Sequence, residues 1–476
     1  MVGSSWGGVL LGSLREERTG RWLLLCNAIV TLLVTWSSME YVLPDAWSYI
    51  ALANGILHGE YSMWWHLEAA YPDTVRMPGF PLVIAGAMYL FGTWIAMIAV
   101  NLILYGLSLY WIRVIILRLN GGVLVWNLFL LILLPMVYVP FYIGQVYTEI
   151  PVLATICLAL FLTTAPGVMG WKRAMILGLL FGCAFQFKPV LLLLPVGHAA
   201  INLWHGPSAR VMLVQAVMLS TFALTLVPFA HWNKHNHDVY SITPLEGGAG
   251  VMHFGWWAGK LPGYTEKVYW NNFAGDELVR FVKDEDLSGN IRAFEAEWEE
   301  VNAQVLPLLT THDSVLLSDT VRTEYPALLS LNARFTLERE RLLKERTFRH
   351  AWADPLYTLV YKAYSAGRFW VIGVQRKEFL NSGVGSRFRM LYATGSTFAV
   401  FVATVLLLPL AFRRGWLRWA DHLHLVYYLV YFGLLHLPFA IQARYTVPVR
   451  LVMFALLAFA LAGLLERQRS IHSQPK

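Results

Sequence analysis

The sequence predicts an all-α polytopic membrane protein, and three observations indicate this. Apolar residues make up 57% of the 476 positions, whereas charged residues make up only 14%. Several windows of more than 17 uncharged, mostly apolar residues are long enough to cross a hydrocarbon core of roughly 30 Å at about 1.5 Å per residue. Positive charges gather at the edges of these windows, as membrane topology requires. The net charge of +7 therefore reflects topology and gives no indication of nucleic-acid binding.

About ten transmembrane helices follow from the apolar runs. The runs are 22–39, 94–118, 122–139, 147–164, 174–187, 189–204, 211–229, 393–412, 421–439 and 447–465. The short connections that are rich in Lys and Arg all fall on one side, together with a basic N-terminus. By the positive-inside rule this side is cytoplasmic. We therefore expect a multi-pass protein of the inner (plasma) membrane, with both termini in the cytoplasm and the first outer loop facing the periplasm or exterior.

Segment 79–92 leaves two alternatives open. It is apolar but short, and Pro78, Gly79 and Pro81 stand at its start. These features favour a re-entrant or interfacial segment, which keeps the count at ten spans. The alternative is a true membrane crossing. In either case the residues around position 45 lie outside, because only the first span precedes them.

The charge distribution divides the chain into three parts. Residues 1–230 form an N-terminal transmembrane module that includes a first outer loop at 40–93, and residues 393–476 form a C-terminal module. Between them, 231–392 is an extracytoplasmic loop region, because 20 of the 30 acidic residues lie between Asp238 and Glu378. Acid–base pairs at helical spacing predict solvated helices in this region. The aromatic-rich stretch 353–370 predicts an interfacial helix.

The sequence also excludes several kinds of site. Its three cysteines, Cys26, Cys157 and Cys183, all lie inside apolar runs, so neither a disulfide framework nor a cysteine metal site is indicated. The chain contains no P-loop and no glycine-rich dinucleotide fingerprint. A donor substrate is therefore expected to arrive through the lipid.

The first outer loop contains the candidate catalytic residue. Asp45 opens a short amphipathic helix that ends at Gly59. About thirty residues after Asp45, Arg76 precedes a Pro-Gly-Phe-Pro turn. A carboxylate beside a membrane is costly to keep unless it has a function. Tyr49 follows Asp45 at helical spacing, on the same face. The alternative interpretation is that Asp45 only caps its helix.

Four stretches of the chain, in order, resemble the GT-C glycosyltransferases, a superfamily of membrane enzymes that includes protein O-mannosyltransferases and the lipid A aminoarabinose transferase. The stretches are PDAWSYIALANGILHGEYS with RMPGFPLVIAGAMYLFG, VYTEIPVLATICLALFL, VPFAHWNKHNHDVYSITPLEGGAGVMHFGWWAGKLPGY and AIQARYTVPVRLVMFALLAF. Two departures stand out. The run from His231 to Lys234 replaces the usual Arg-Asn, and no second acidic residue accompanies Asp45.

The resemblance implies a GT-C-type bundle and a polyprenyl-phosphate-sugar-dependent glycosyltransferase of the EC 2.4 class. Such an enzyme moves a sugar from a polyprenyl-phosphate-linked donor to a lipid, glycan or protein acceptor on the extracytoplasmic face. Asp45 would act as the general base of a reaction that inverts the anomeric centre. Because Asp45 lacks an acidic partner, no metal ligand is assigned, although a divalent metal stays possible.

Further residues are candidates for donor and acceptor binding. We expect Arg76, Lys188, Arg444 and Tyr445 to bind the donor phosphate, and the three cations to converge near Asp45. Snorkelling or an aromatic-belt anchor is the alternative for each cation. Auxiliary or acceptor-binding roles are assigned to Glu149, Tyr49, His66 and His253. Glu149 alternatively forms an internal salt bridge, and the histidines are alternatively ordinary interfacial residues. The run Asp284–Asp286 is expected to be solvated surface.

A different class of function fits the composition as well. A polytopic transporter or a flippase of lipid-linked saccharides would also have many spans and some buried charges. Transporters usually contain paired halves with broken helices at matching positions. This chain instead has seven predicted spans before one large outer loop and three after it, which favours the glycosyltransferase. A non-catalytic partner subunit is the third alternative.

Overall fold

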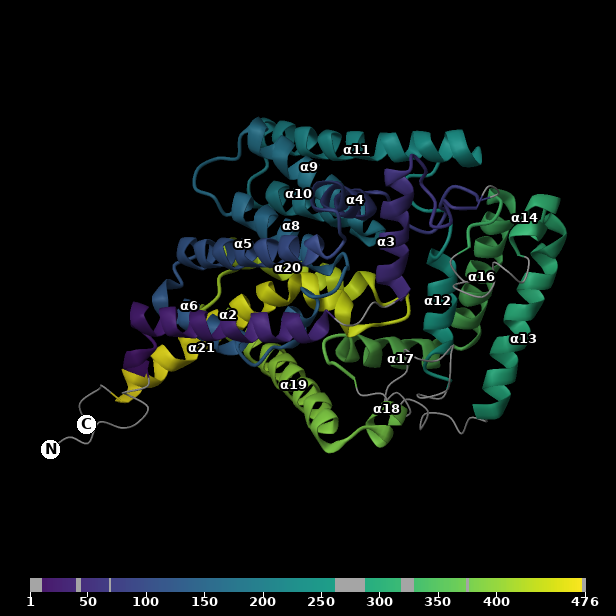
Figure 1. Cartoon of the computed structure of the whole chain (residues 1–476). Helices are drawn as coiled ribbons and strands as arrows, with labels where there is room; N and C mark the ends of the chain where they lie inside the picture. The colour runs from purple at the N-terminus through teal and green to yellow at the C-terminus, as the bar shows by residue number, and fades with distance from the viewer. Residues whose placement is uncertain are drawn as a thin grey trace.

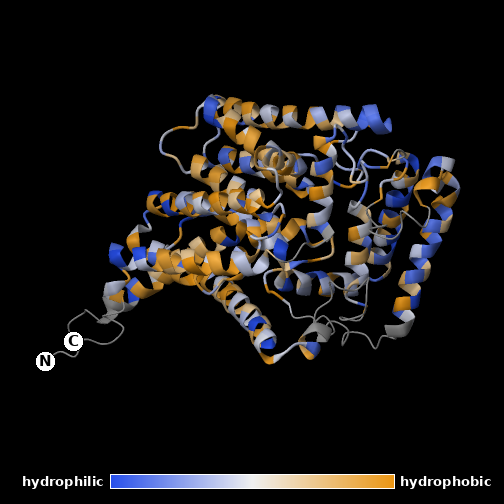
Figure 2. Cartoon of the chain, viewed as in Figure 1, coloured by the Kyte–Doolittle hydropathy of each residue, from blue (hydrophilic) through white to orange (hydrophobic). Residues whose placement is uncertain are grey.

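The computed structural model describes residues 11–39, 44–67, 70–261, 287–317, 329–373 and 376–472, and all regular structure in these ranges is helical. Figure 1 shows a bundle of roughly parallel helices on one side and a second group of helices on the other. The bundle helices are largely apolar, whereas the second group carries much more polar sequence (Figure 2). The charge that the sequence concentrates in its middle part is therefore also concentrated in one region of the structure.

The second group of helices is called the outer group below, and both it and the bundle consist of several elements. Those of the bundle are α2 (Glu17–Ser38), α5 (Ala96–Arg118), α6 (Gly122–Leu133), α7 (Tyr138–Phe141), α8 (Glu149–Thr163), α9 (Trp171–Phe187), η1 (Pro189–Leu193), α10 (Leu194–His205), α11 (Ala209–His237), α19 (Val384–Arg413), α20 (Trp419–Leu435), η5 (Ala443–Thr446) and α21 (Val447–His472). The outer group consists of α12 (Gly248–Trp257), α13 (Leu287–Val305), η3 (Leu306–Leu308), α14 (Thr311–Leu316), α16 (Ala333–Ala353), α17 (Pro355–Arg368) and α18 (Arg376–Asn381). Between them lie α3 (Pro44–Leu57) and α4 (Gly79–Phe91).

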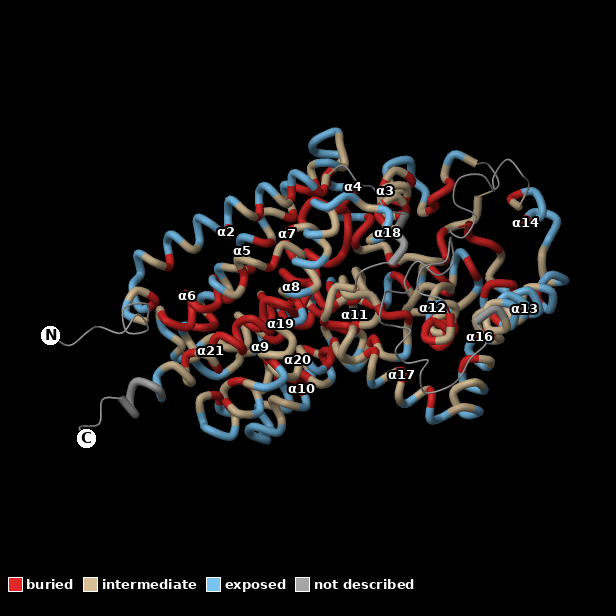
Figure 3. The backbone as a smooth tube through the Cα atoms, turned by 90° about the horizontal axis from the view of Figure 1, so that it is seen from below, coloured by how far each residue is buried: buried red, intermediate tan, exposed pale blue. Residues whose placement is uncertain are grey.

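The core of the bundle is built around α21. In its most apolar stretch 83% of the residues are buried, against 17–33% in the other four long apolar helices. It packs against α5, α6, α8, α19 and α20, and Figure 3 shows it as mostly buried, whereas α2 is exposed along one side. An exposed apolar face on α2 and α19 is the pattern expected for helices that contact lipid.

Each of the ten predicted apolar runs coincides with helix in the structure. Among the described residues, five helices are long and apolar enough to cross a membrane: α2, α5, α11, α19 and the last helix, from Ala443 to Arg467. The remaining runs correspond to shorter helices, of which α10 ends at Gly206 and α9 ends just before Pro189. The apolar runs therefore predicted the positions of the helices correctly, whereas the number of helices that cross the membrane stays a prediction.

The first outer loop contains two helices that lie across the direction of the bundle (Figure 1). The helix α4 has 13 residues, which corresponds to about 20 Å and is shorter than a hydrocarbon core of about 30 Å. It ends at Gly92, whose φ of 72° is the left-handed conformation that glycine adopts easily. α4 packs against α3, α5 and α9, and its length favours the interfacial alternative.

The outer region is helical where the charge pattern predicted helices. α16 begins at the N-cap Asn332, whose side chain accepts a hydrogen bond from the backbone of Phe335 at 2.9 Å. Arg341 forms ion pairs with Glu338 and Glu345 on its exposed face. The predicted interfacial helix is α17, which starts at Pro355 after the capping residue Asp354. The whole group packs onto one end of the bundle.

Candidate active site

Asp45 lies between two arginines at the end of the bundle that faces the outer helices. Its Oδ1 accepts a hydrogen bond from Nη2 of Arg76 at 2.5 Å, and its Oδ2 accepts one from Nη2 of Arg444 at 2.5 Å. The three side chains are 31%, 21% and 13% exposed, respectively. Both carboxylate oxygens are thus occupied by guanidinium groups. The alternative that Asp45 serves only as a helix cap is not supported by these contacts.

Local sequence explains how the two arginines reach Asp45. Arg444 lies on η5, a short 3₁₀ turn between an extended residue, Gln442, and the start of α21. This position is at the outer end of the most buried helix. Arg76 lies in the connection between α3 and α4, and its Nε donates to Ser48 Oγ at 3.2 Å. Ser48, one turn after Asp45 on α3, is itself completely buried.

Asp73 shapes the turn that carries Arg76. Its Oδ1 accepts hydrogen bonds from the backbone N–H groups of Val75, at 3.0 Å, and Arg76, at 2.6 Å. This is the local bonding typical of an aspartate two or three residues before a turn. The side chain is 1% exposed, and its Oδ2 has no partner among the described residues. Burial raises the pKa of Asp73 to about 7, although hydrogen bonds from Arg76 and Val75 oppose this effect.

The outer region braces the same turn. The backbone N–H of Thr74 donates to Ser330 Oγ at 3.0 Å, and the carbonyl of Thr74 accepts from the N–H groups of Leu245 and Glu246, both at 3.0 Å. Glu246 in turn pairs with Arg339 of α16. The position of Arg76 therefore depends on residues that lie more than 150 positions further along the chain.

A second ion pair lies beside the first. Lys188 Nζ is 3.0 Å from Glu149 Oε1, and the two side chains are 14% and 2% exposed. Pro189 disfavours helical geometry at Lys188, which is extended with φ −148° and ψ 104°. The break between α9 and η1 therefore places the lysine at the outer end of these helices. Glu149 thus forms the internal salt bridge that the sequence left as the alternative to an acceptor-binding role.

Aromatic rings surround both ion pairs. The guanidinium carbon of Arg76 is 5.0 Å from the ring centroid of Tyr49. Arg444 is similarly 4.9 Å from Tyr147 and 5.3 Å from Tyr445. Lys188 Nζ is 4.8 Å from Tyr445, whose ring thus lies between two cations. Cation–π contacts of this kind hold the cations at defined positions without neutralising them.

The electrostatics of the centre favour an ionised carboxylate. Burial raises the pKa of Asp45, but the charges and hydrogen bonds of Arg76 and Arg444 outweigh this effect and hold the pKa well below its ordinary value. One donor group of the centre is left over. The Nε of Arg444 is buried and has no partner among the described residues. Since a buried donor without a partner is costly, it is available to an additional anion.

Two predicted site residues lie elsewhere. His66 is exposed and contacts Trp64 and Trp65 on the turn after α3. His253 is fully buried on α12, where it lies 3.5 Å from Glu297 of α13. Burial lowers the pKa of His253 to about 4. Neither residue contacts Asp45, because each is packed by aromatic neighbours in its own part of the outer region. The run Asp284–Asp286 lies outside the described residues.

The donor set of the centre does not suit a metal ion. A cation at Asp45 would have to displace two guanidinium groups from its carboxylate. Within the described ranges no group of three or more His, Cys, Asp or Glu side chains could hold a metal ion. The charges present instead suit an anionic ligand.

Sequence reasoning missed residues that support the centre, above all Asp73, Ser48 and Tyr147. A signal existed for Asp73, because Pro-Asp-x-x-Arg is a turn pattern with a side-chain acceptor. Tyr147 stands two positions before Glu149, which points it to the same end of α8. Ser48 had no such signal, since a serine inside a helix most often bonds only its own backbone. It does so here too, donating to the carbonyl of Asp45 at 2.7 Å.

Fold and centre together define a class: an all-helical bundle of membrane character with a carboxylate held between two arginines at one end. Searches of family models and of curated proteins gave no match. Two solved structures are similar in fold. One is the archaeal oligosaccharyltransferase AglB of Archaeoglobus fulgidus, in complex with an inhibitory peptide and a dolichol-phosphate, with 12% identity and a TM-score of 0.46. The other is ArnT of Cupriavidus metallidurans bound to undecaprenyl phosphate, with 13% identity and a TM-score of 0.32.

The two matched structures differ in how much of them the chain spans. The AglB match covers 96% of this chain but only 52% of the AglB chain, so the present chain spans about half of that protein. The ArnT match covers 93% of this chain and 78% of the other.

Proposed function

We propose that this chain is a membrane glycosyltransferase that moves a sugar from a polyprenyl-phosphate-linked donor to an acceptor at the outer end of the bundle. One observation carries the proposal: Asp45 is bound by Arg76 and Arg444, while Lys188 and Tyr445 lie next to this pair. Phosphate is the leaving group that such cations stabilise. The carboxylate is the group that can accept a proton from the acceptor.

The chemistry is a single displacement. The acceptor oxygen or nitrogen attacks the anomeric carbon and transfers its proton to Asp45. The bond between the anomeric carbon and the phosphate oxygen breaks, and its electron pair leaves with the phosphate. One carboxylate on one side of the sugar predicts inversion, because no second nucleophile forms a covalent intermediate.

The arginine contacts give Asp45 a role that depends on the donor. A carboxylate whose pKa is held low is a weak base. When a phosphate binds, it competes with Asp45 for the guanidinium groups of Arg76 and Arg444. Each contact that Asp45 loses raises its pKa toward the ordinary value. The base would thus become effective when the donor occupies the site.

An apolar cavity beside the centre fits the lipid chain of the donor. Its volume is about 380 Å³, and its lining includes Tyr61, Gly79, Leu82 and Gln186. Tyr61 donates to the carbonyl of Arg76 at 3.0 Å, and Gln186 stands two residues before Lys188. An isoprenoid chain in this cavity would bring its phosphate to the cations. A second apolar cavity of about 360 Å³ lies between the end of α17 and the helices α19, α20 and α21.

The proposal includes an orientation. Arg15 pairs with Glu466 at 3.2 Å, and Arg113 with Glu17 at 3.5 Å, so the basic flanks of several helices meet at the end of the bundle away from Asp45. The positive-inside rule makes that end cytoplasmic. The three-part division into residues 1–230, 231–392 and 393–476 follows the same logic, with the middle part outside.

The experiment that tests the function measures bond cleavage. Purified protein is incubated with a mixture of polyprenyl-phosphate-linked sugars extracted from the envelope, and release of free polyprenyl phosphate is followed by mass spectrometry. A transferase releases polyprenyl phosphate when its acceptor is present. A transporter or flippase moves the same lipids between leaflets without breaking the bond, and that result would contradict the proposal.

A further inference from the structure

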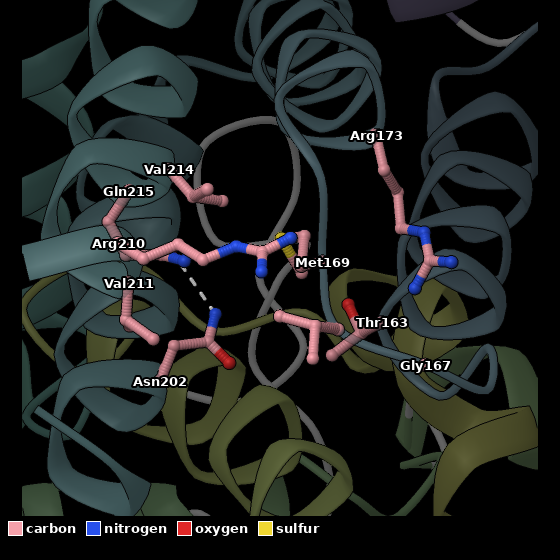
Figure 4. A pocket seen from close by; sticks show the side chains of 10 residues that line it. Thr163, Gly167, Met169, Arg173, Asn202, Arg210, Val211, Val214 and Gln215 are labelled. Atoms are coloured by element: carbon pink, nitrogen blue, oxygen red, sulfur yellow. Dashed lines mark hydrogen bonds between the residues drawn. The ribbon is translucent and has the colours of Figure 1, made fainter. Parts of the chain in front are cut away.

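A polar cavity lies at the opposite end of the bundle from Asp45. Its volume is about 210 Å³, and it is lined by the end of α8, the following loop, the start of α9, the end of α10 and the start of α11. Figure 4 shows the side chains of Arg173 and Arg210 on its walls, together with Asn202 and Gln215. None of these residues belongs to the centre around Asp45.

Two helices fix the separation of this cavity from the candidate active site. α8 begins at Glu149, beside Lys188, and ends at Thr163, which lines the cavity. Its 15 residues correspond to about 22 Å. α9 runs back from Arg173 near its start to Lys188 just after its end. The cavity therefore lies at the end of the bundle that carries the basic flanks.

The two arginines of the cavity have no acidic partner. Arg173 donates to the backbone carbonyls of Ala165 and Pro166, at 3.2 and 3.3 Å. Arg210 is exposed, and its side chain has no hydrogen-bond or ion-pair partner among the described residues. Between positions 119 and 237 the only acidic residue is Glu149, at the far end of α8. Within the described ranges neither arginine of the cavity forms an ion pair with a carboxylate.

Two amide side chains form part of the cavity lining. Asn202 Nδ2 donates to Gln215 Oε1 at 3.2 Å, which closes one wall of the cavity. Gln215 is only 3% exposed, so this bond holds the wall of the cavity in a fixed arrangement.

The geometry points to a binding site for the phosphate group of an anionic membrane lipid. The guanidinium groups of Arg173 and Arg210 supply positive charge and forked donors, which is the recognition that a phosphate oxyanion requires. The volume exceeds the roughly 30 Å³ of one water but is below the roughly 300 Å³ at which drug-sized pockets begin. A basic pocket between apolar helices, at the end where lipid headgroups lie, matches a phospholipid headgroup better than a free metabolite.

The test compares lipid and free phosphate on the purified full chain. Short-chain phosphatidylglycerol, phosphatidylcholine and inorganic phosphate are titrated into detergent-solubilised protein, and apparent affinity is taken from the shift of the thermal unfolding midpoint. Arg210→Gln is the test variant, since Arg210 is exposed and its loss breaks no protein contact. Arg414→Gln is the matched control, because Arg414 is an exposed arginine just after α19 that does not line the cavity.

We expect phosphatidylglycerol to stabilise the wild type and Arg414→Gln, with an apparent affinity at least tenfold weaker in Arg210→Gln, and phosphatidylcholine to have no effect. Equal affinities in wild type and Arg210→Gln would overturn the site. Stabilisation by inorganic phosphate but not by phosphatidylglycerol would overturn the assignment to a lipid. Because the readout is binding at the end remote from Asp45, either result is independent of whether the chain transfers sugars.

Discussion

Asp45 and Arg444 are 399 positions apart in the chain, yet their side chains are joined by a hydrogen bond of 2.5 Å. Arg444 stands immediately before the most buried helix of the bundle, whereas Asp45 starts a helix of the first outer loop. This contact links the two ends of the sequence at the candidate active site. It also means that the acid and one of its cations are positioned by separate parts of the fold.

Replacing Arg444 should therefore affect donor use more than folding. In Arg444→Gln, Asp45 keeps Arg76 as a partner, so we expect a loss of stability of about 1–2 kcal/mol, less than for a fully orphaned buried charge. The loss of a bidentate cation should lower kcat/KM by roughly 100-fold or more. Steady-state kinetics and thermal unfolding measure the two effects. Arg444→Lys, which keeps the charge but not the fork, should be intermediate, and full activity in Arg444→Gln would exclude a phosphate role.

Glu149 and Lys188 should behave as a coupled buried pair. Lys188→Met leaves Glu149 uncompensated at 2% exposure, so we expect a destabilisation of about 3 kcal/mol, and a similar one for Glu149→Gln. The double variant removes both charges and should cost less than the sum by at least about 1 kcal/mol. Unfolding of the four proteins of this cycle, under one set of conditions, gives the coupling. Strict additivity would show that the ion pair contributes nothing.

Asp73 should make stability depend on pH. Burial raises its pKa to about 7 in the folded chain, whereas an unfolded aspartate has a pKa near 3.9. Between these values the folded state binds the additional proton, so stability falls as pH rises from about 4 to 7. We expect a loss of about 1–3 kcal/mol over this range in wild type.

The matched variant for this effect is Asp73→Asn. Asparagine keeps the acceptor oxygen for the N–H groups of Val75 and Arg76 but cannot ionise, so its stability should be nearly flat over the same range. Thermal unfolding midpoints at a series of pH values provide the comparison. If both proteins show the same slope, another group controls the dependence.

Filling the apolar cavity beside Arg76 should weaken donor binding. Leu82 lines this cavity and is 53% exposed, so Leu82→Trp should occupy the space without disrupting the core. We expect KM for a polyprenyl-linked donor to rise at least about tenfold. Leu90→Trp, at a 72% exposed position of the same helix outside the cavity lining, is the control and should leave KM unchanged. An unchanged KM in Leu82→Trp would place the lipid chain elsewhere.

The sequence was most informative about apolar runs, which form membrane helices, and about charged residues, which topology places at one end of the bundle. The apolar runs predicted the bundle helices, and Arg76 and Arg444 were expected beside Asp45 because topology puts all three at one face. Lys188 was expected beside them too, but it pairs with Glu149 and does not contact Asp45. It is linked to Arg444 only by the ring of Tyr445, which both cations contact. Their roles in phosphate binding stay predictions.

Tertiary packing determined what could not be predicted. His253 was expected near the centre, but α12 turns it toward α13 and α16, where Glu297 and aromatic rings surround it. The bracing of Thr74 by Ser330 joins positions 256 apart, and no local pattern encodes such a contact. The same holds for the cavity at Arg210, which forms only where four helix ends meet.

Substitution of Asp45 by asparagine tests the central claim most directly. Asn keeps the shape of the side chain and one acceptor oxygen, so we expect Asp45→Asn to fold, with an unfolding midpoint lowered because Arg76 and Arg444 lose their counter-charge. It should bind undecaprenyl phosphate at least as tightly as wild type, because both arginines are released, and bound undecaprenyl phosphate should restore part of the lost stability. Release of polyprenyl phosphate from a lipid-linked sugar should fall by at least about 1,000-fold, within the range of general-base contributions. Turnover within about tenfold of wild type, which corresponds to only about 1.4 kcal/mol of barrier, would contradict the assignment of Asp45 as the base.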